Sequence, residues 1–205
     1  MVTLVEWMHQ CEINPDEGVC ISIATDGLAA HKSNVIAVSC VSNTFPLTTL
    51  LVEGGNPYTT QKYHGIDPEL YFSEASNVRT VEKQLKEIMD GMRFVILKDT
   101  SFFIPFCTYP PLRYLEEFVS FDVIFYMQLL DLMEHIRPSE AGTDLYDLNE
   151  YIQTRIGGKG FKAGYSFPTI YSRVTGKSAD DYTYASVLEA RASQLLELYN
   201  HILIL

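Results

Sequence analysis

A run of basic and aromatic residues near the end of the chain has the composition of a nucleic-acid contact. Residues 151–179 contain no acidic residue and carry a formal charge of +5, which leaves −16 for the rest of a chain whose total is −11. Basic side chains follow phosphates and aromatic rings stack on bases, so this segment is a candidate contact for single-stranded nucleic acid. A solvated loop whose aromatic residues join the core is the alternative. The basic residues are Arg155, Lys159, Lys162, Arg173 and Lys177.

Side chains that commonly bind metals are scattered along the sequence. The five histidines include no pair at metal-ligand spacing, and the four cysteines include no Cys-x-x-Cys pair. A zinc site is therefore not expected, because structural zinc sites draw their ligands from closely spaced pairs. We expect four free thiols in a reducing setting. These cysteines are Cys11, Cys20, Cys40 and Cys107.

The composition predicts one folded domain. The chain has 205 residues, of which 47% are hydrophobic and 20% charged, values that favour a globular core over disorder. We expect a single domain over residues 1–205, in which residues 1–17 form an N-terminal helix and turn. There is no signal-peptide pattern and no apolar stretch of the roughly 20 residues that a membrane helix needs. The expectation is a cytoplasmic protein without a membrane partner.

The order of expected elements predicts an α/β fold. Three runs rich in β-branched residues, 19–25, 34–42 and 48–52, are bounded by turn residues and predict an antiparallel meander. The apolar run 93–97 is typical of a covered parallel strand, and 120–123 predicts one more strand. Helical spacing predicts helices that pack on this mixed sheet. Their expected ranges are 3–12, 78–92, 112–118, 124–136, 145–156, 167–174 and 183–204.

Several short segments, in this order, resemble the DnaQ-like (DEDD) 3′–5′ exonucleases. That family opens with a strand bearing D-x-E, followed by T-T-G-L. Here Thr25, Gly27 and Leu28 match the frame, whereas Ser22 stands at the Asp position and Ala24 at the Glu position. The resemblance covers about residues 18–205 and implies an RNase H-like, DnaQ-like fold.

Later segments extend the resemblance. Residues 64–69 are similar to the family's H-G-I segment, and residues 121–123 to a strand that ends in an aspartate. Residues 95–103 are similar to H-N-x-x-F-D, with Phe103 at the Asp position. Residues 167–177 are similar to L-P-x-L-Y-x-x-x-x-G-K. Residues 184–190 are similar to H-x-A-L-x-D-A on the last helix, with Tyr184 replacing the His and Glu189 the Asp.

The resemblance also implies a metal-dependent reaction. This chain lacks most of the carboxylate ligands that the reaction needs. The family hydrolyses a terminal phosphodiester with two divalent metals that lie about 3.5–4 Å apart. Four carboxylates hold these metals. Ser22 offers a neutral hydroxyl, Ala24 offers no ligand, and Phe103 would partly fill the cleft with an apolar ring. The resemblance therefore implies an inactive exonuclease-like protein without a cofactor. It would act as an interaction or scaffold module in a nucleic-acid-processing complex, with a protein partner or by self-association.

Two alternatives remain open. In the first, the chain is a residual 3′–5′ exonuclease with an altered metal site, in which Asp26 and Glu189 hold one Mg²⁺ or Mn²⁺ and Tyr184 orients a water. Residues 22, 24 and 26 of a strand share one face, which would point Asp26 to that site. Asp26 would otherwise shape the turn before Gly27. In the second, the chain binds single-stranded nucleic acid through the basic segment without cleaving it.

Overall fold

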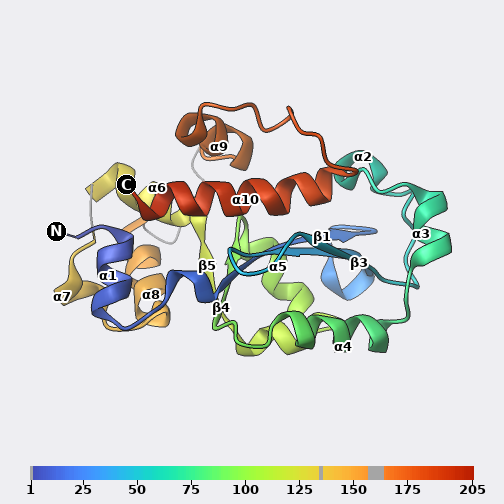
Figure 1. Cartoon of the computed structure of the whole chain (residues 1–205), viewed down its shortest axis with the longest axis horizontal. Helices are drawn as coiled ribbons and strands as arrows, with labels where there is room; N and C mark the ends of the chain where they lie inside the picture. Colours follow the sequence, from blue (N-terminus) through green and yellow to red (C-terminus); the bar gives the residue numbers. More distant parts are fainter. Residues whose placement is uncertain (1, 134–135, 157–163) are drawn as a thin grey trace.

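The computed structural model describes residues 2–133, 136–156 and 164–205, and the backbone alone at 133. At its centre is a five-stranded sheet with the order β3-β2-β1-β4-β5 (Figure 1). The strands are β1 (Gly18–Thr25), β2 (Val35–Val41), β3 (Thr48–Leu51), β4 (Phe94–Leu97) and β5 (Val119–Asp122).

The sheet is mixed, as the sequence predicts. β1 pairs antiparallel with β2, and β2 with β3, which forms the expected meander. β4 pairs parallel with β1 and with β5. The carboxyl ends of β1, β4 and β5 therefore meet at one edge of the sheet, where Leu97 lies opposite Asp122.

The two faces of the sheet are covered by different helices. Figure 1 shows α10 (Val187–Leu203) along one face, with α4 (Val78–Ile88) and α5 (Thr100–Cys107) on the other. Side chains alternate along β1, because successive residues of a strand point to opposite faces. Cys20 joins the core cluster of α10, whereas Val19 and Ile21 join the cluster of α4 and α5.

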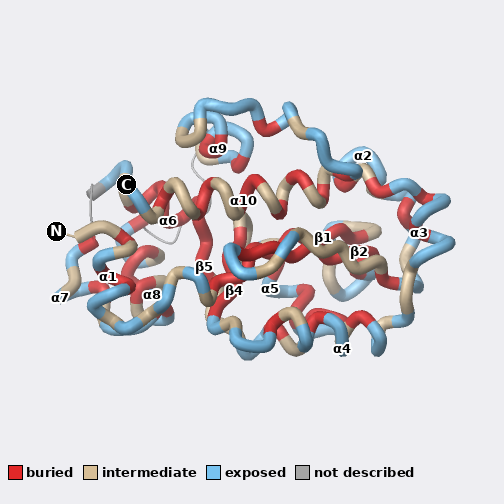
Figure 2. Tube along the Cα trace, viewed as in Figure 1, coloured by how far each residue is buried: buried red, intermediate tan, exposed pale blue. Residues whose placement is uncertain are grey.

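The remaining helices enlarge the core on the α10 side. Three side chains of the N-terminal helix, Leu4, Trp7 and Met8, are completely buried there, so this helix is part of the main core. Figure 2 shows how burial concentrates in the strands and on the inward side of α10. The other helices of the described chain are α1 (Leu4–Gln10), α2 (Gln61–His64), α3 (Pro68–Glu74), α6 (Val123–Met133), α7 (Pro138–Ala141), α8 (Leu145–Ile156) and α9 (Phe167–Thr175).

The structure corrects several expected helix bounds. The last helix begins at Val187 and not at residue 183, because the Ser186 hydroxyl accepts the N–H of Glu189 and caps the helix there. Residues 113–117 form a short 3-10 helix within the predicted helix 112–118. Helices α2, α3, α5 and α7 were not expected. None of the helices in the described ranges combines the length and apolar character that crossing a bilayer requires.

One buried carboxylate joins three elements at the carboxyl edge of the sheet. Asp122 ends β5 and is only 4% exposed. Its Oδ1 accepts the N–H groups of Ile124 and Phe125 at 2.9 and 3.2 Å, which caps the start of α6. Its Oδ2 accepts the N–H and the hydroxyl of Thr100 at 2.9 and 3.1 Å, at the start of α5. Burial raises the pKa of Asp122, and these four hydrogen bonds oppose that rise.

Removing this carboxylate is expected to cost more than removing an exposed helix cap. Asp122→Ala leaves four donors without an acceptor, and we expect a loss of about 3 kcal/mol in the free energy of unfolding. The matched control is Asp99→Ala, which removes the more exposed cap of α5 at Phe102 and should cost about 1 kcal/mol. Urea unfolding of both variants measures the difference. Equal losses would contradict a special role for Asp122.

Candidate functional site

The two β1 positions that correspond to the family's D-x-E lie under α10 and are closed to solvent. Ser22 is 6% exposed and Ala24 is 3% exposed. Ala24 packs in an apolar cluster with Ile36, Ile66 and Leu188. A carboxylate in place of Ala24 would have to displace this packing, so the local surroundings are built for an apolar side chain.

The carboxylate of Asp26 accepts hydrogen bonds within the turn that follows β1. Its Oδ1 accepts the backbone N–H of Asn34 at 2.6 Å, and its Oδ2 accepts the Asn34 side-chain amide at 3.0 Å. The Oδ2 atom also accepts the N–H of Asn56 at 3.3 Å. These contacts connect the loops after β1 and β3, which is the turn-shaping role that the sequence offered as an alternative to metal binding.

Phe103 does not fill the cleft between the sheet and α10, contrary to the sequence-based expectation. It is 4% exposed and packs with Val19, Ile21 and Leu97 in the core beneath α4 and α5. The reason is that residues 100–107 form helix α5 on the sheet face opposite α10. Phe103 therefore replaces a carboxylate in the sequence motif without entering the space near Ser22 and Ala24.

The two candidates from the C-terminal motif lie at the start of α10. Tyr184 precedes the helix and is 42% exposed, and it lines a surface groove with Leu196 and Glu197. Glu189 lies in the first turn of α10 and is partly buried. Across the described ranges, no three or more His, Cys, Asp or Glu side chains are grouped so that they could hold a metal ion.

The side chains that do approach this region are cations. The residue after β4 is Lys98, and the alternation of Phe94 and Ile96 places it on the α10 side of the sheet. Its Nζ lies 5.6 Å from the centroid of the Phe167 ring, and the Cζ of Arg191 lies 5.8 Å from the same centroid. We call Lys98 and Arg191 the cation pair.

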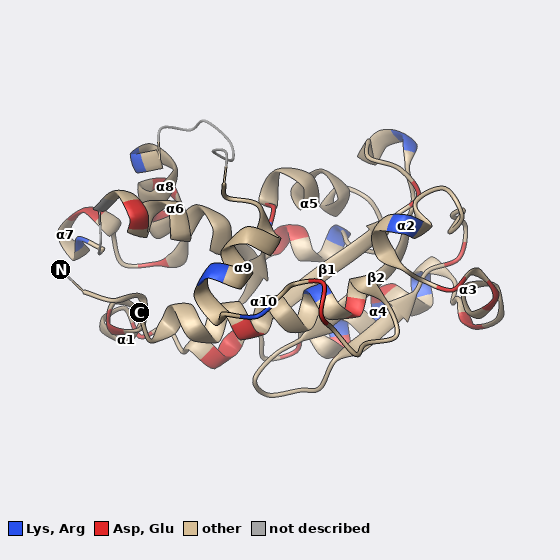
Figure 3. Cartoon of the chain, turned by 90° about the horizontal axis from the view of Figure 1, so that it is seen from above, with Lys and Arg blue, Asp and Glu red and all other residues tan. Residues whose placement is uncertain are grey.

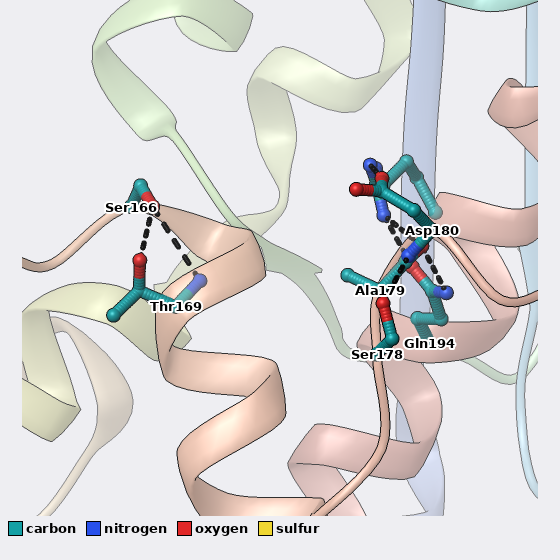
Figure 4. Close-up of polar contacts among 7 residues, drawn as sticks. Ser166, Thr169, Ser178, Ala179, Asp180 and Gln194 are labelled. Atoms are coloured by element: carbon teal, nitrogen blue, oxygen red, sulfur yellow. Dashed lines mark hydrogen bonds and ion pairs between the residues drawn. The ribbon is translucent and has the colours of Figure 1, made fainter.

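Arg191 is held in place by the segment that precedes α10. Its Nη1 donates to the carbonyl of Ala179 and to the Gln194 side chain, both at 2.7 Å, and its Nη2 lies 3.3 Å from Asp180. Gln194 also donates to the Ala179 carbonyl at 2.8 Å. Figure 4 shows Ala179, Asp180 and Gln194 close together, with Ser166 and Thr169 at the start of α9 lying across from them.

The charge of Lys98 is only weakly compensated. Burial, together with repulsion from Arg191, lowers the pKa of Lys98 to about 8, although Asp99 acts in the opposite direction. Within the described ranges, Lys98 has no hydrogen bond and no ion pair. The amino-terminal end of α9, capped by Ser166, adds the positive end of a helix dipole beside Phe167.

In the structure, three basic residues of the predicted segment each form an ion pair with an acidic residue. Arg155 pairs with Glu140, Arg173 with Asp131, and Lys177 with Glu197. In Figure 3, basic and acidic segments lie next to each other around α9 and α10 and do not form one basic face. Lys159 and Lys162 lie outside the described residues.

Sequence reasoning did not identify the cation pair as a site. Lys98 follows four apolar residues of a buried strand, and a lysine at that position is the one signal that could have pointed to it. Arg191 lies 93 positions later, and nothing in its local sequence connects it to Lys98. Only the packing of α10 and α9 against the sheet brings the two residues to one aromatic ring.

Among solved structures, the chain is similar to exonuclease I of E. coli. A structure of that enzyme gives a TM-score of 0.48 at 10% identity and covers 89% of this chain and 42% of the other. A zinc-bound complex with single-stranded DNA gives 0.47 and 10%, with 89% and 42% covered. A complex with a dA16 oligonucleotide gives 0.44 and 12%, with 67% and 41% covered.

These likenesses carry no argument about function, because every TM-score is below 0.5 and the identities are very low. The chain spans less than half the length of these exonuclease chains. No protein-family model and no curated protein matches the chain. The function must therefore be argued from the residues of the site.

The buried charge of Lys98 is expected to lower the stability of the fold. Lys98→Met should raise the free energy of unfolding at pH 7 by about 1–2 kcal/mol, which is less than the full pKa shift implies because solvent screens a partly buried charge. The gain should be present below pH 8 and fade towards pH 10.5, because only the unfolded chain keeps Lys98 protonated in that window.

Urea unfolding between pH 6 and pH 10.5 measures this dependence. The control is Lys83→Met on α4, where the lysine is 81% exposed and the change should be close to zero. A Lys98→Met variant that is less stable than the wild type at pH 7, or whose gain does not depend on pH, would contradict the expected cost.

Proposed function

We propose that this chain is a non-catalytic protein with an exonuclease-like fold, which acts by binding and not by hydrolysis. The observation that carries the proposal is the set of side chains that face α10 at the carboxyl ends of β1 and β4. These are a serine, an alanine and a lysine, namely Ser22, Ala24 and Lys98. Two hard divalent cations need several carboxylate oxygens, and these positions supply none.

The charge of the site supports the same proposal. Lys98 and Arg191 bring two positive charges to the α10 side of the sheet, on which Ser22 and Ala24 also lie, and both would repel a divalent cation there. Of the weak metal candidates, Asp26 is already hydrogen bonded within its turn. Glu189 would be left as a single carboxylate ligand. A magnesium or manganese ion is therefore not part of the proposed function.

The proposed binding role includes a protein partner or self-association within a nucleic-acid-processing complex. Support comes from an exposed aromatic pair near α3. Tyr58 and Phe72 are 62% and 63% exposed, and their ring centroids lie 6.1 Å apart. Exposed aromatic side chains that contact one another are typical of protein contact surfaces. Nucleic-acid binding through the 155–177 segment is less favoured, because Arg155, Arg173 and Lys177 are already in ion pairs.

A 3′–5′ degradation assay tests the absence of catalysis. Labelled single-stranded DNA and RNA are incubated with the chain in Mg²⁺ or Mn²⁺, beside the variants Asp26→Ala and Glu189→Ala. We expect no cleavage above the background of the two variants, because the metal ligands are missing. Cleavage by the wild type that either substitution abolishes would show an altered metal site and would overturn the proposal.

Self-association is tested by sedimentation equilibrium. If the aromatic pair forms the contact, the apparent mass should rise with concentration, and Phe72→Ser should weaken association by about tenfold or more. The control is Tyr146→Ser, at an exposed tyrosine on α8 away from the aromatic pair. A monomer at every concentration would contradict self-association and leave a different protein as the partner. An equal effect of both variants would place the contact elsewhere.

A further inference from the structure

We propose that the cation pair, together with the start of α9, forms a binding site for a phosphate group and binds it without a metal ion. This inference rests on the proposed non-catalytic function and names a ligand for the same region of the fold. The ligand class is a phosphate monoester or diester anion. Inorganic phosphate and the phosphates of an oligonucleotide share this chemistry.

Lys98 has no ion-pair partner within the described chain. A partly buried ammonium group is costly unless it is paired with an anion or fully hydrogen bonded. No carboxylate of the described chain lies within ion-pair distance of Lys98, and its nearest recorded contact is the Phe167 ring at 5.6 Å. Asp99 is the adjacent carboxylate, but its Oδ1 already accepts from Ser101 and Phe102.

The neighbours of Lys98 increase the positive electrostatic potential around its ammonium group. Arg191 approaches the same ring of Phe167 from α10, and Asp180, its ion-pair partner, is 86% exposed and lies 3.3 Å from Nη2. Phe167 is the first residue of α9, so the positive end of that helix dipole lies beside the cation pair. Pro168 has no N–H, and the N–H of Thr169 is accepted by the Ser166 hydroxyl at 3.4 Å, so the helix acts here through its dipole. Two cations and the positive end of one helix therefore lie around the Phe167 ring.

A phosphate group is a suitable ligand for this arrangement of positive groups. A phosphate carries at least one full negative charge and several acceptor oxygens, so it can take hydrogen bonds from an ammonium and a guanidinium group at once. The start of a helix is also a favourable place for a phosphate. Arg191 is already fixed by the Ala179 carbonyl and Gln194, so little ordering of its side chain would oppose binding.

Isothermal titration calorimetry with EDTA present tests the site. The probes are inorganic phosphate, a short oligothymidylate with a terminal phosphate, and the same oligonucleotide with a terminal hydroxyl. We expect phosphate and the phosphorylated oligonucleotide to bind, and Lys98→Met to weaken both by about tenfold or more. Lys83→Met, which removes an exposed lysine from the opposite face, should leave both affinities unchanged.

The outcomes of this titration test the phosphate site independently of the proposed absence of catalysis. Binding of phosphate alone would identify a small-anion site. Preference for the phosphorylated oligonucleotide would identify a nucleic-acid end as the source of the phosphate.

Absence of binding at low salt, or binding that Lys98→Met leaves intact, would overturn the phosphate site and leave the non-catalytic function standing. Because Lys98→Met is expected to fold at least as well as the wild type, lost binding would not reflect unfolding. Metal-dependent cleavage would instead overturn the proposed function.

Discussion

The carboxylate of Asp122 is the contact on which the geometry of the candidate site depends. It accepts the N–H and hydroxyl of Thr100, two residues after Lys98, and also caps α6 through Ile124 and Phe125. One buried group therefore fixes the turn that leaves β4 and the helix that leaves β5. Because β4 and β5 are parallel neighbours, this contact also fixes where Lys98 leaves the sheet. A buried carboxylate is tolerated here because its oxygens are fully used as acceptors.

The cation pair differs from Asp122, because one of its two charged groups has no hydrogen bond or ion pair in the described chain. Arg191 is well satisfied by Ala179, Gln194 and Asp180, whereas Lys98 keeps its charge in a partly buried position without an ion-pair partner in the described chain. Folding does not need such a charge, since an apolar side chain of similar length would fill the same space at lower cost. Groups that lower stability in this way are characteristic of sites retained for binding or chemistry. Position and cost together make Lys98 the residue of greatest interest in this fold.

The contrast between Phe103 and Ala24 shows why a difference from the motif of a resembling family does not by itself describe the site. Both stand at positions where the resembling family has a carboxylate. Ala24 does lie under α10, packed against Leu188 and Ile66, so that position is part of the core. Phe103 lies on the opposite face of the sheet with Val19 and Ile21. The aromatic ring beside Lys98 and Arg191 is that of Phe167 at the start of α9, and not a ring from α5.

The sequence by itself determined the mixed sheet and most of its helices, because strand alternation, β-branched runs and turn residues are local signals that act within a few residues. It did not determine helix α5, whose internal Pro105 and short length give no helical pattern, and whose start depends on the Asp99 cap and on Asp122. It also placed basic residues 155–177 together, whereas the tertiary structure pairs the described ones with acidic partners from other helices. Only the tertiary structure brought Lys98 to Arg191, since contacts between residues so far apart in sequence arise from the packing of whole elements.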